Sequence, residues 1–293
     1  MNLNRPPERR GPRPGPRSGS LSLAPAERTH ARNADAGRAA RAGAIRERFE
    51  ALAGRDALLN VGGLVAGYGA KEVLHGIDLK LGSGQFLCVI GPNGGGKSTL
   101  LHSIFGLADI RAGRVDIGPR NVTRLGPSAK LRDAGIACVL HDNSLFLDLT
   151  VEQNLWLGGY LSGRRPDARQ ATERVFDRHP GLAARRNDLA GALSNGERRF
   201  LEIARAVVTG PKLLLIDDPW TGLEPDVVER IFAMLRELKD SDRLSIVMAE
   251  SNARRGLEVA DIGCVLVAGE VARVGTGAEL LDDPGVVQLF LGS

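Results

Sequence analysis

The sequence is poor in aromatic residues and cysteine and has no long apolar run, and each shortage excludes a class of function. Aromatic residues make up 4% of its 293 residues, too few for a protein that stacks bases on aromatic platforms. The three cysteines, Cys88, Cys138 and Cys264, lie in apolar runs without metal-ligand spacing, as is typical of buried, reduced core residues in a cytosolic protein. No apolar stretch approaches the roughly 20 residues that span a bilayer, and none near the N-terminus resembles a signal region. If the protein acts at a membrane, we expect another chain to supply the span.

Basic residues are concentrated in the first fifth of the chain. Residues 1–56 contain 12 Arg, no Lys and six acidic residues, a net charge of +6. The remainder contains 27 basic and 29 acidic residues, a net charge of −2. The overall charge of +4 therefore belongs to the tail and not to the folded body, whose length and composition suffice for a hydrophobic core.

The basic tail has two parts. Residues 1–34 are rich in Pro, Gly, Arg and Ser, so we expect them to be disordered. In residues 35–53, Ile45, Phe49 and Leu52 recur at helical spacing and predict a short amphipathic helix. Three interpretations of the tail stay open: a solvated extension or over-called start codon, a weak contact with acidic lipid or nucleic acid, and an organellar transit segment, against which its acidic residues count.

From about residue 57 onward, strand-like and helix-like segments alternate. We expect strands at residues 58–67, 73–81, 113–117, 135–140, 213–216, 244–248, 263–267 and 270–274. The first two are expected to pair antiparallel. Helical patterns occupy residues 150–190, with breaks at Gly158-Gly159 and Pro180-Gly181, then residues 196–208, a segment from Pro225, and the C-terminus. Alternation through the centre predicts an α/β fold with a mainly parallel sheet and helices on both sides.

One stretch carries a phosphate-binding pattern. Residues 91–98, Gly-Pro-Asn-Gly-Gly-Gly-Lys-Ser, fit G-x-x-x-x-G-K-[ST] at every fixed position. The apolar run Phe86–Ile90 before it reads as a strand, and residues 98–107 after it have helical composition. Glycines let backbone N–H groups turn inward to form an anion cradle with the helix N-terminus. We expect Lys97 to reach the β- and γ-phosphates of a nucleotide and Ser98 to hold Mg²⁺; the alternative is an ordinary glycine turn.

A second stretch supplies the carboxylate that such a loop requires. Four apolar residues precede Asp217, which places it at the carboxyl end of a buried strand beside the loop. We interpret Asp217 as a Mg²⁺ partner, although a helix cap at a strand end would show the same pattern. Asp218 follows directly and, by strand alternation, is expected to point the opposite way, a position suited to polarising an attacking water.

Between these two stretches lies Leu193-Ser194-Asn195-Gly196-Glu197-Arg198-Arg199, at the start of a predicted helix. With the loop upstream and Asp217 downstream, this order resembles the ATP-binding subunits of ABC transporters. The resemblance runs from Leu58 to the C-terminus, about four fifths of the chain. It implies a P-loop NTPase core with an antiparallel β subdomain and a helical subdomain at about residues 145–200, so that residues 57–293 form one ATP-binding domain and residues 1–56 a disordered tail.

The resemblance also implies roles for single residues. Tyr68 matches the aromatic residue that stacks on adenine, and Leu213–Asp217 matches the strand that ends in the Mg²⁺ carboxylate. Residues 221–224 match the loop that touches the opposite subunit. The nucleotide loop comprises Gly91, Pro92, Asn93, Gly94, Gly95, Gly96, Lys97, Ser98 and Thr99. Residues 146–155, 250–255 and 275–281 look most like the branched-chain amino-acid importer subgroup.

The Leu193–Glu197 stretch matches the family's signature loop. It opens a helix, so Ser194 and Gly196 can offer hydroxyl and N–H donors to a γ-phosphate. In the family these donors act across a dimer, on ATP held by the other subunit. Without the resemblance, the stretch would read as an N-cap before an amphipathic helix, whose buried face is predicted to contain Phe200, Ile203, Ala204 and Val207.

Several positions depart from the family pattern. His141 stands where Gln or Glu is usual, and it could ligate a metal or orient water. Asp218 replaces the usual Glu, which shortens the expected catalytic carboxylate by one methylene. Ser251 aligns with a switch position that is often His, and Asn195 and Trp220 replace the usual Gly and Ser/Thr. Changes at the hydrolytic positions suggest slow hydrolysis at this chain's own site, with a partner's site turning over faster in a heterodimer.

The sequence thus predicts a cytoplasmic ATPase subunit, peripheral on the inner face of the membrane, that energises an ABC importer. Its cofactors are expected to be ATP and Mg²⁺. Its expected partners are a second ATP-binding subunit, in a homo- or heterodimer, integral membrane permease subunits and, indirectly, a solute-binding protein; no specific nucleic acid is expected. Branched-chain amino acids or related small polar solutes are the expected cargo. The alternatives are a degenerate ATP-binding regulatory subunit and a non-transport ABC ATPase.

Overall fold

A computed structural model describes residues 25–141, 144–160, 165–220 and 222–291. The chain forms two units, residues 1–41 and residues 42–293. The first helix, α1 (Pro25–Ala53), begins in the first unit and ends in the second.

Helix α1 begins earlier than predicted but ends at the predicted residue, Ala53. It begins at Pro25, so residues 25–34, expected to be disordered, are helical; they contain Ala, Glu and Arg, which are good helix formers. The expectation of disorder for residues 1–24 lies outside the described residues. Phe49 and Ala53 are buried in the core of the second unit. The folded body therefore includes the end of this helix, which had been assigned to the tail.

A four-stranded antiparallel sheet follows. Its order is β2-β1-β4-β5, formed by β1 (Ala57–Tyr68), β2 (Lys71–Gly82), β4 (Asp109–Ile117) and β5 (Arg120–Asn121). The predicted antiparallel pairing of the first two strands is confirmed. Strand β4 begins four residues before the predicted strand because residues 109–112 pair with β1, an interaction that local sequence does not encode.

The second sheet has six strands in the order β10-β9-β3-β8-β7-β6. These are β3 (Phe86–Ile90), β6 (Ile136–Val139), β7 (Leu213–Asp217), β8 (Ser245–Glu250), β9 (Ile262–Val267) and β10 (Glu270–Gly275). All neighbours pair parallel except the β9–β10 hairpin. The predicted mainly parallel sheet and C-terminal strand pair are confirmed.

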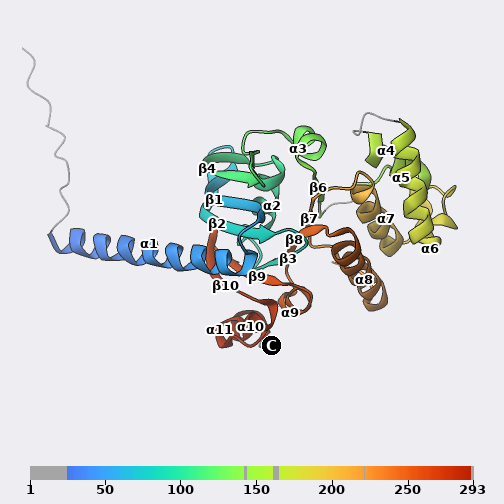
Figure 1. The fold of residues 1–293 in the computed structure, drawn as a ribbon. Helices are drawn as coiled ribbons and strands as arrows, with labels where there is room; N and C mark the ends of the chain where they lie inside the picture. Colours follow the sequence, from blue (N-terminus) through green and yellow to red (C-terminus); the bar gives the residue numbers. More distant parts are fainter. Residues whose placement is uncertain (1–24, 142–143, 161–164, 221, 292–293) are drawn as a thin grey trace, which may run out of the picture. The chain divides into compact units, whose positions relative to one another are not determined.

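Strand β3 separates two hydrophobic cores. Phe86, Cys88 and Ile90 face one core, and the alternate residues Leu87 and Val89 face the other. The second core also contains the buried side of α2 (Lys97–Phe105), the helix that follows β3, and the antiparallel sheet. Helix α2 therefore lies between the two sheets (Figure 1). Helix α3 (Pro127–Ala134) precedes β6.

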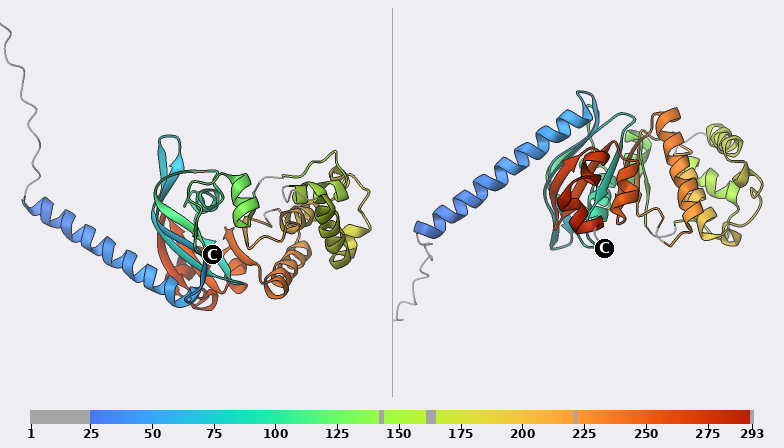
Figure 2. Two further views of the ribbon diagram at one scale, coloured as in Figure 1. Left: turned by 45° about the horizontal axis from the view of Figure 1, so that its top comes forward. Right: turned by 90° about the horizontal axis from the view of Figure 1, so that it is seen from below.

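The predicted helical region is also confirmed. It contains α4 (Val151–Gly159), α5 (Arg165–Arg178), α6 (Pro180–Ala183), the short η2 (Ala190–Ala192) and α7 (Asn195–Val207). These helices group together on the side of the second unit away from β1, β2 and β4 (Figures 1 and 2). Helix α4 ends at Gly159, which confirms the predicted break at Gly158-Gly159.

The buried face of α7 is rotated relative to the prediction. Phe200 and Val207 are only half-buried, whereas Arg199 and Glu202 are buried. Ile203 and Ala204 are fully buried, as expected. A charged pair therefore occupies part of the face that was expected to be apolar.

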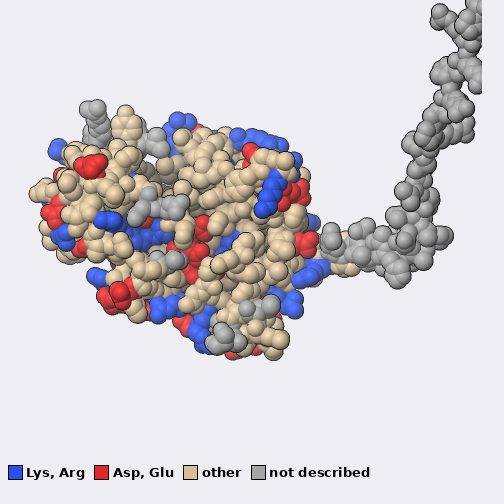
Figure 3. Space-filling model, turned by 180° about the vertical axis from the view of Figure 1, so that it is seen from behind, with Lys and Arg blue, Asp and Glu red and all other residues tan. Residues whose placement is uncertain are grey.

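The chain continues through α8 (Pro225–Asp242) and α9 (Ala253–Glu258) and ends in α10 (Gly277–Leu281), α11 (Pro284–Val286) and the π-helical η3 (Val287–Leu291). No helix among the described residues is long and apolar enough to cross a membrane. On the face of the second unit shown in Figure 3, acidic and basic side chains are intermingled.

The three cysteines differ in how deeply they are buried. Cys88 and Cys264 are buried, but Cys138 is half-buried. Burial raises the pKa of the Cys138 and Cys264 thiols to about 12. These two thiols therefore stay protonated at neutral pH and are poor nucleophiles.

Candidate active site

The loop between β3 and α2 has the geometry of an anion cradle. Gly94 and Gly96 have φ values of 77° and 104°, in the left-handed region that favours glycine. Gly96 is the N-cap of α2, and no side chain caps the helix. The first backbone N–H groups of α2 therefore have no side-chain acceptor, and such groups bind anions.

The loop requires glycine at the positions where the β9–β10 hairpin packs against its backbone. A Cβ atom at Gly91 would lie 2.1 Å from the Leu266 carbonyl oxygen, and one at Gly95 would lie 2.9 Å from the Pro92 oxygen. The Gly269 N–H, in the hairpin turn, donates to the Gly95 carbonyl at 2.9 Å. These contacts fix the backbone of the loop.

Lys97 is held by the loop itself. Its ammonium donates to the Gly91 and Pro92 carbonyl oxygens at 2.8 and 3.3 Å, and the residue is only 6% exposed. An ammonium that has only backbone partners keeps its charge available for an anionic ligand placed in the loop.

Asp217 lies beside the first turn of α2. It is 2% exposed at the end of β7. Its carboxylate accepts a hydrogen bond from Ser98, which opposes the upward shift that burial imposes on its pKa. The Oδ1 atom has no hydrogen-bond partner. The structure therefore brings Ser98 and Asp217 together, as predicted, and leaves one buried carboxylate oxygen available.

His141 is exposed in the segment that follows β6. The described residues contain no group of three His, Cys, Asp or Glu side chains arranged to hold a metal ion. A metal at Asp217 would therefore need oxygen ligands from Ser98 and from phosphate or water.

Asp218 does not follow the strand alternation that was predicted for it. Strand β7 ends at Asp217, and Asp218 adopts a left-handed conformation with φ of 39°. Its carboxylate accepts hydrogen bonds from the backbone N–H and the hydroxyl of Ser251, at 2.9 and 3.1 Å. Two of the three predicted catalytic residues are thus in direct contact.

Glu250 was not predicted as a site residue. It ends β8, is 2% exposed and leaves Oε2 without a partner. Burial raises its pKa to about 8, and the charge of Asp218 adds to this shift. The rule that identified Asp217, a carboxylate after an apolar strand, would also have identified Glu250.

Tyr68 lies beside α2, whereas the signature loop lies at the start of α7. The Tyr68 hydroxyl is 2.7 Å from Nδ1 of His102 in α2, and the tyrosine is exposed at the end of β1. Ser194 caps α7 in a reciprocal pair with Glu197. Within the described part of the chain, no hydrogen bond joins Ser194 or Gly196 to residues 91–99. The loop and the signature of one chain are therefore not brought together.

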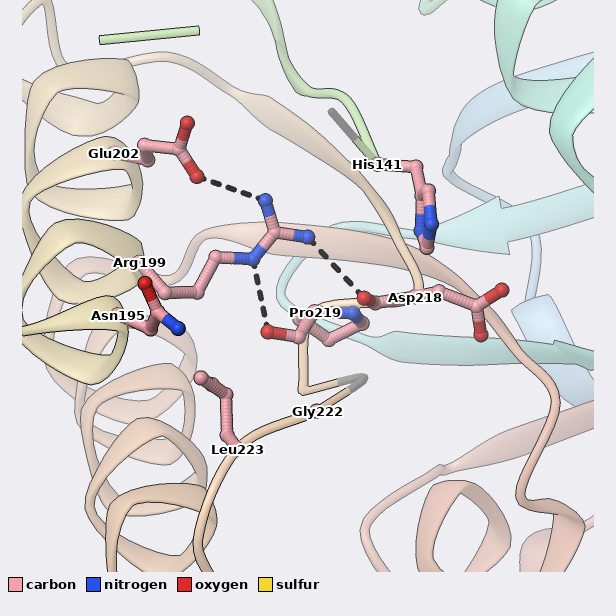
Figure 4. Close-up of a pocket in the computed structure, with 8 residues that line it drawn as sticks. All are labelled: His141, Asn195, Arg199, Glu202, Asp218, Pro219, Gly222 and Leu223. Carbon is pink, nitrogen blue, oxygen red and sulfur yellow. Dashed lines mark hydrogen bonds and ion pairs between the residues drawn. The ribbon is translucent and has the colours of Figure 1, made fainter. Parts of the chain in front are cut away.

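A cavity of about 290 Å³ separates α7 from the ends of β6 and β7. Its lining is His141, Asn195, Arg199, Glu202, Asp218, Pro219, Gly222 and Leu223. Figure 4 shows Asn195, Arg199 and Glu202 projecting from α7, with His141 and Asp218 on the opposite side. Arg199 and Glu202 were missed as site residues, since charges three apart on a helix usually form an exposed pair. Thr221, in the predicted intersubunit loop, lies outside the described residues.

Comparison with known proteins gives consistent matches. Residues 74–221 match the family described as ABC transporter. The chain is 37% identical to the probable branched-chain amino acid transport ATP-binding protein LivF of Archaeoglobus fulgidus, over 78% of this chain and 96% of that protein. It is 34% identical to the high-affinity branched-chain amino acid transport ATP-binding protein BraG of Pseudomonas aeruginosa, over 77% and 95%. It is 31% identical to the lipopolysaccharide export system ATP-binding protein LptB of Escherichia coli, over 80% and 98%.

Solved structures agree with the fold. A nucleotide-free ATP-binding cassette from an ABC transporter superposes with a TM-score of 0.71 at 28% identity, covering 81% of this chain and all of that one. The ADP conformation of an ATP-binding cassette of an ABC transporter gives a TM-score of 0.71 at 27% identity, covering 81% of this chain and 99% of that one.

Proposed function

This chain belongs to the ABC transporter ATP-binding family, a family of ATPases, and on that basis we propose that it binds MgATP and powers the import of branched-chain amino acids or related small polar solutes. The observation that carries the proposal is the convergence of Lys97, Ser98 and Asp217 at the carboxyl ends of β3 and β7. This convergence supports a phosphate and a metal bound side by side.

The residues present fit a Mg²⁺ ion. Mg²⁺ prefers carboxylate, hydroxyl and phosphate oxygens and needs few protein ligands. The unpartnered Oδ1 of buried Asp217 and the adjacent Ser98 hydroxyl are ligands of this kind. When bound there, Mg²⁺ would neutralise charge on the β- and γ-phosphates. We propose Asp217 and Ser98 as the principal metal ligands, with the exposed His141 in a secondary role.

The remaining loop residues would bind and orient the nucleotide. Backbone N–H groups of Gly94 to Thr99 would surround the β-phosphate, and Lys97 would exchange its two carbonyl acceptors for phosphate oxygens. Tyr68, exposed beside α2, has an aromatic face that could stack on adenine. Ser194 and Gly196, which in the described part of the chain form no hydrogen bond to residues 91–99, would complete the site of a second ATP-binding subunit.

Asp218 would polarise the attacking water, but two of its contacts restrain it. Its carboxylate is held by Ser251, and its side chain is one methylene shorter than glutamate. A general base acts only within hydrogen-bond reach of the proton that it takes. These observations favour slow hydrolysis at this chain's own site, and they are also the ones that support the second candidate, a subunit that binds ATP and regulates a more active partner.

An apolar patch on the helical region supports a membrane partner. Phe146, Leu147 and Leu189 are exposed where residues 147–150 pair with residues 189–191. Trp156, Leu157 and Tyr160 of α4 are also exposed. Exposed apolar groups of this kind mark interaction sites. We propose that permease subunits dock here, which would place the protein on the cytoplasmic face of a membrane and couple it indirectly to a solute-binding protein.

The proposed function is tested in the assembled transporter. The tagged chain would be purified with the membrane proteins that accompany it and reconstituted in liposomes. We expect Mg²⁺-dependent ATP hydrolysis and ATP-dependent uptake of leucine, isoleucine or valine. Lys97→Ala should weaken MgATP binding to this chain by about 10²-fold, because it removes a cation from the bound phosphates.

The control is Glu47→Ala, an exposed position on α1, which should behave as wild type. Unchanged MgATP binding by the purified Lys97→Ala chain would contradict the nucleotide assignment. Hydrolysis without uptake, in an assembly that instead extracts lipid from the liposomes, would contradict import and favour export.

A further inference from the structure

One side chain outside the predicted site uses every hydrogen-bond donor that it has. The Arg199 guanidinium has five N–H groups. Its Nε donates to the Pro219 carbonyl at 2.8 Å, Nη1 to the Leu140 carbonyl at 2.9 Å, and Nη2 to the carbonyls of Asp217 and Asp218 at 2.9 and 3.3 Å. The fifth contact joins Nη1 to the Glu202 carboxylate at 2.9 Å (Figure 4).

These contacts connect three elements. Arg199 lies in the second turn of α7, whose N-cap is Ser194 of the signature loop. Leu140 immediately precedes His141, and Asp217 to Pro219 form the end of β7 and the turn after it. The Arg199 guanidinium therefore hydrogen-bonds to the carbonyl of the residue that precedes His141 and to the carbonyl of Asp218 itself.

Burying the Arg199–Glu202 ion pair costs free energy that a purely structural role would not require. Arg199 is 7% exposed and Glu202 is 2% exposed, and removing two charges from water costs several kcal/mol per ion. A buried ion pair can often be replaced by apolar residues of similar volume at no cost in stability. What apolar residues cannot supply is a planar fork that fixes four carbonyl groups in one arrangement.

Glu202 extends the contacts one step further. Its Oε1 accepts hydrogen bonds from the backbone N–H and hydroxyl of Ser144, at 2.6 and 3.3 Å. Arg205, one turn along α7, donates to the Ser144 carbonyl at 2.8 Å. The same helix therefore also holds the segment that leads into the apolar patch at Phe146 and Leu147.

We propose that Arg199, oriented by Glu202, is the positioning residue that fixes the Asp218 backbone against α7, so that movement of the signature helix sets the geometry of the hydrolytic carboxylate. The proposal rests on the proposed ATPase function of this site. Asp218 has a strained left-handed backbone and a short side chain, so its reach depends on where its backbone is held. Arg199 holds it on one side through the carbonyl, and Ser251 holds it on the other through the carboxylate.

Three variants test the role. Arg199→Met keeps the length of the side chain and removes all donors, Arg199→Lys keeps the charge without the planar fork, and Glu202→Gln keeps the shape without the counter-charge. In an assembly whose partner subunit carries the change equivalent to Asp218→Asn, so that only this chain's own site turns over, we expect Arg199→Met to lower kcat by about 10–100-fold, because a misplacement of about 1 Å can cost about 10²-fold, while the Kd of MgATP changes less than about threefold. Arg199→Lys and Glu202→Gln should retain intermediate kcat values.

The matched control is Arg198→Met. Arg198 is the neighbouring residue on α7 and also donates to two carbonyls, those of Ala190 and Gly191, but it does not bond to β7. Its kcat should stay within about twofold of wild type. A normal kcat in Arg199→Met, or an equal loss in Arg198→Met, would overturn the positioning role.

A second measurement separates this role from the ATPase assignment. Exchange of the backbone amide hydrogens of Asp217, Asp218 and Trp220 should accelerate in Arg199→Met and not in Arg198→Met, with or without nucleotide. If wild-type protein does not hydrolyse ATP, the proposed function fails, and unchanged exchange would still overturn the positioning role on its own. If Arg199→Met does not fold, Glu202→Gln decides both readouts.

Discussion

Two carboxylates, Asp217 and Glu250, end neighbouring parallel strands and are equally buried, yet they have different surroundings. Asp217 accepts a hydrogen bond from Ser98, which favours its charged form. Burial raises the pKa of both carboxylates, and at Glu250, where one oxygen accepts a hydrogen bond from the Asn252 N–H, it raises the pKa to about 8. We infer that Asp217 is the better cation ligand and that Glu250 is largely protonated in the folded protein at neutral pH.

The raised pKa of Glu250 predicts a pH dependence of stability. Its pKa is about 8 in the folded protein against 4.5 as a reference, so between these values the folded state binds a proton that the unfolded state has released. Stability therefore falls as pH rises through this window, by at most about 1.4 kcal/mol per pH unit. Glu250→Gln removes this dependence, so the wild-type melting temperature should drop more than the variant's between pH 5.5 and 7.5.

The control for this measurement is Glu47→Gln on the exposed surface, which should follow wild type. Equal slopes for wild type and Glu250→Gln would show that the folded and unfolded proteins bind the same number of protons at this position.

At the same scale, the sequence predicted the contacts that are local and missed the ones that are not. Lys97 meets Gly91 and Ser98 lies at the start of α2 because a strand, a glycine loop and a helix are consecutive in the chain. The contact of Asp217 with Ser98 followed from strand order in a parallel sheet. The contacts of Arg199 with Leu140 and Asp218 depend on how α7 packs against two strand ends, which no local pattern encodes.

Among the elements, the end of α1 was predicted as part of the tail but belongs to the hydrophobic core of the second unit. Phe49 is 1% exposed and packs in the core that also contains β1, β2 and α2. In the same turns, Arg46 pairs with Asp78 of β2 at 3.1 Å, and Glu50 accepts from Lys80 at 2.7 Å. The helical spacing of Ile45, Phe49 and Leu52 was visible in the sequence, but the surface that they cover was not.

Phe49→Ala should therefore destabilise the folded body. Loss of a buried phenylalanine costs about 3–5 kcal/mol through lost burial and the cavity left behind. Urea unfolding should show this decrease, while Glu47→Ala, two residues earlier and exposed, should change stability by less than about 0.5 kcal/mol. A Phe49→Ala variant as stable as wild type would mean that the helix end does not belong to the cooperative unit.

For the whole molecule, the separation of the signature loop from its own nucleotide loop predicts unequal sites in a heterodimer. One site would use this chain's Lys97 and Asp218, and the other would use its Ser194 and Gly196 with the partner's loop. We expect Asp218→Asn to lower the total ATPase of the assembly less than about twofold, and the equivalent change in the partner to lower it about 10²-fold or more.

Steady-state hydrolysis by the two singly altered assemblies measures this difference, with the purified wild-type assembly as reference. If Asp218→Asn alone abolishes turnover, the two sites are not unequal in the expected direction, and a homodimer or an active site on this chain follows.

The packing of the nucleotide loop on the β9–β10 hairpin has a consequence for synthesis of the chain. Gly269 in that hairpin bonds to Gly95, and its carbonyl accepts from the His75 N–H at 2.9 Å. Strand β3 also has both of its neighbours, β8 and β9, late in the sequence. On the ribosome, the loop at residues 91–99 emerges long before these supports exist. A nascent chain that already displays the signature helix therefore cannot hold a nucleotide in this loop, and the first ATP can bind only when nearly the whole chain has been made.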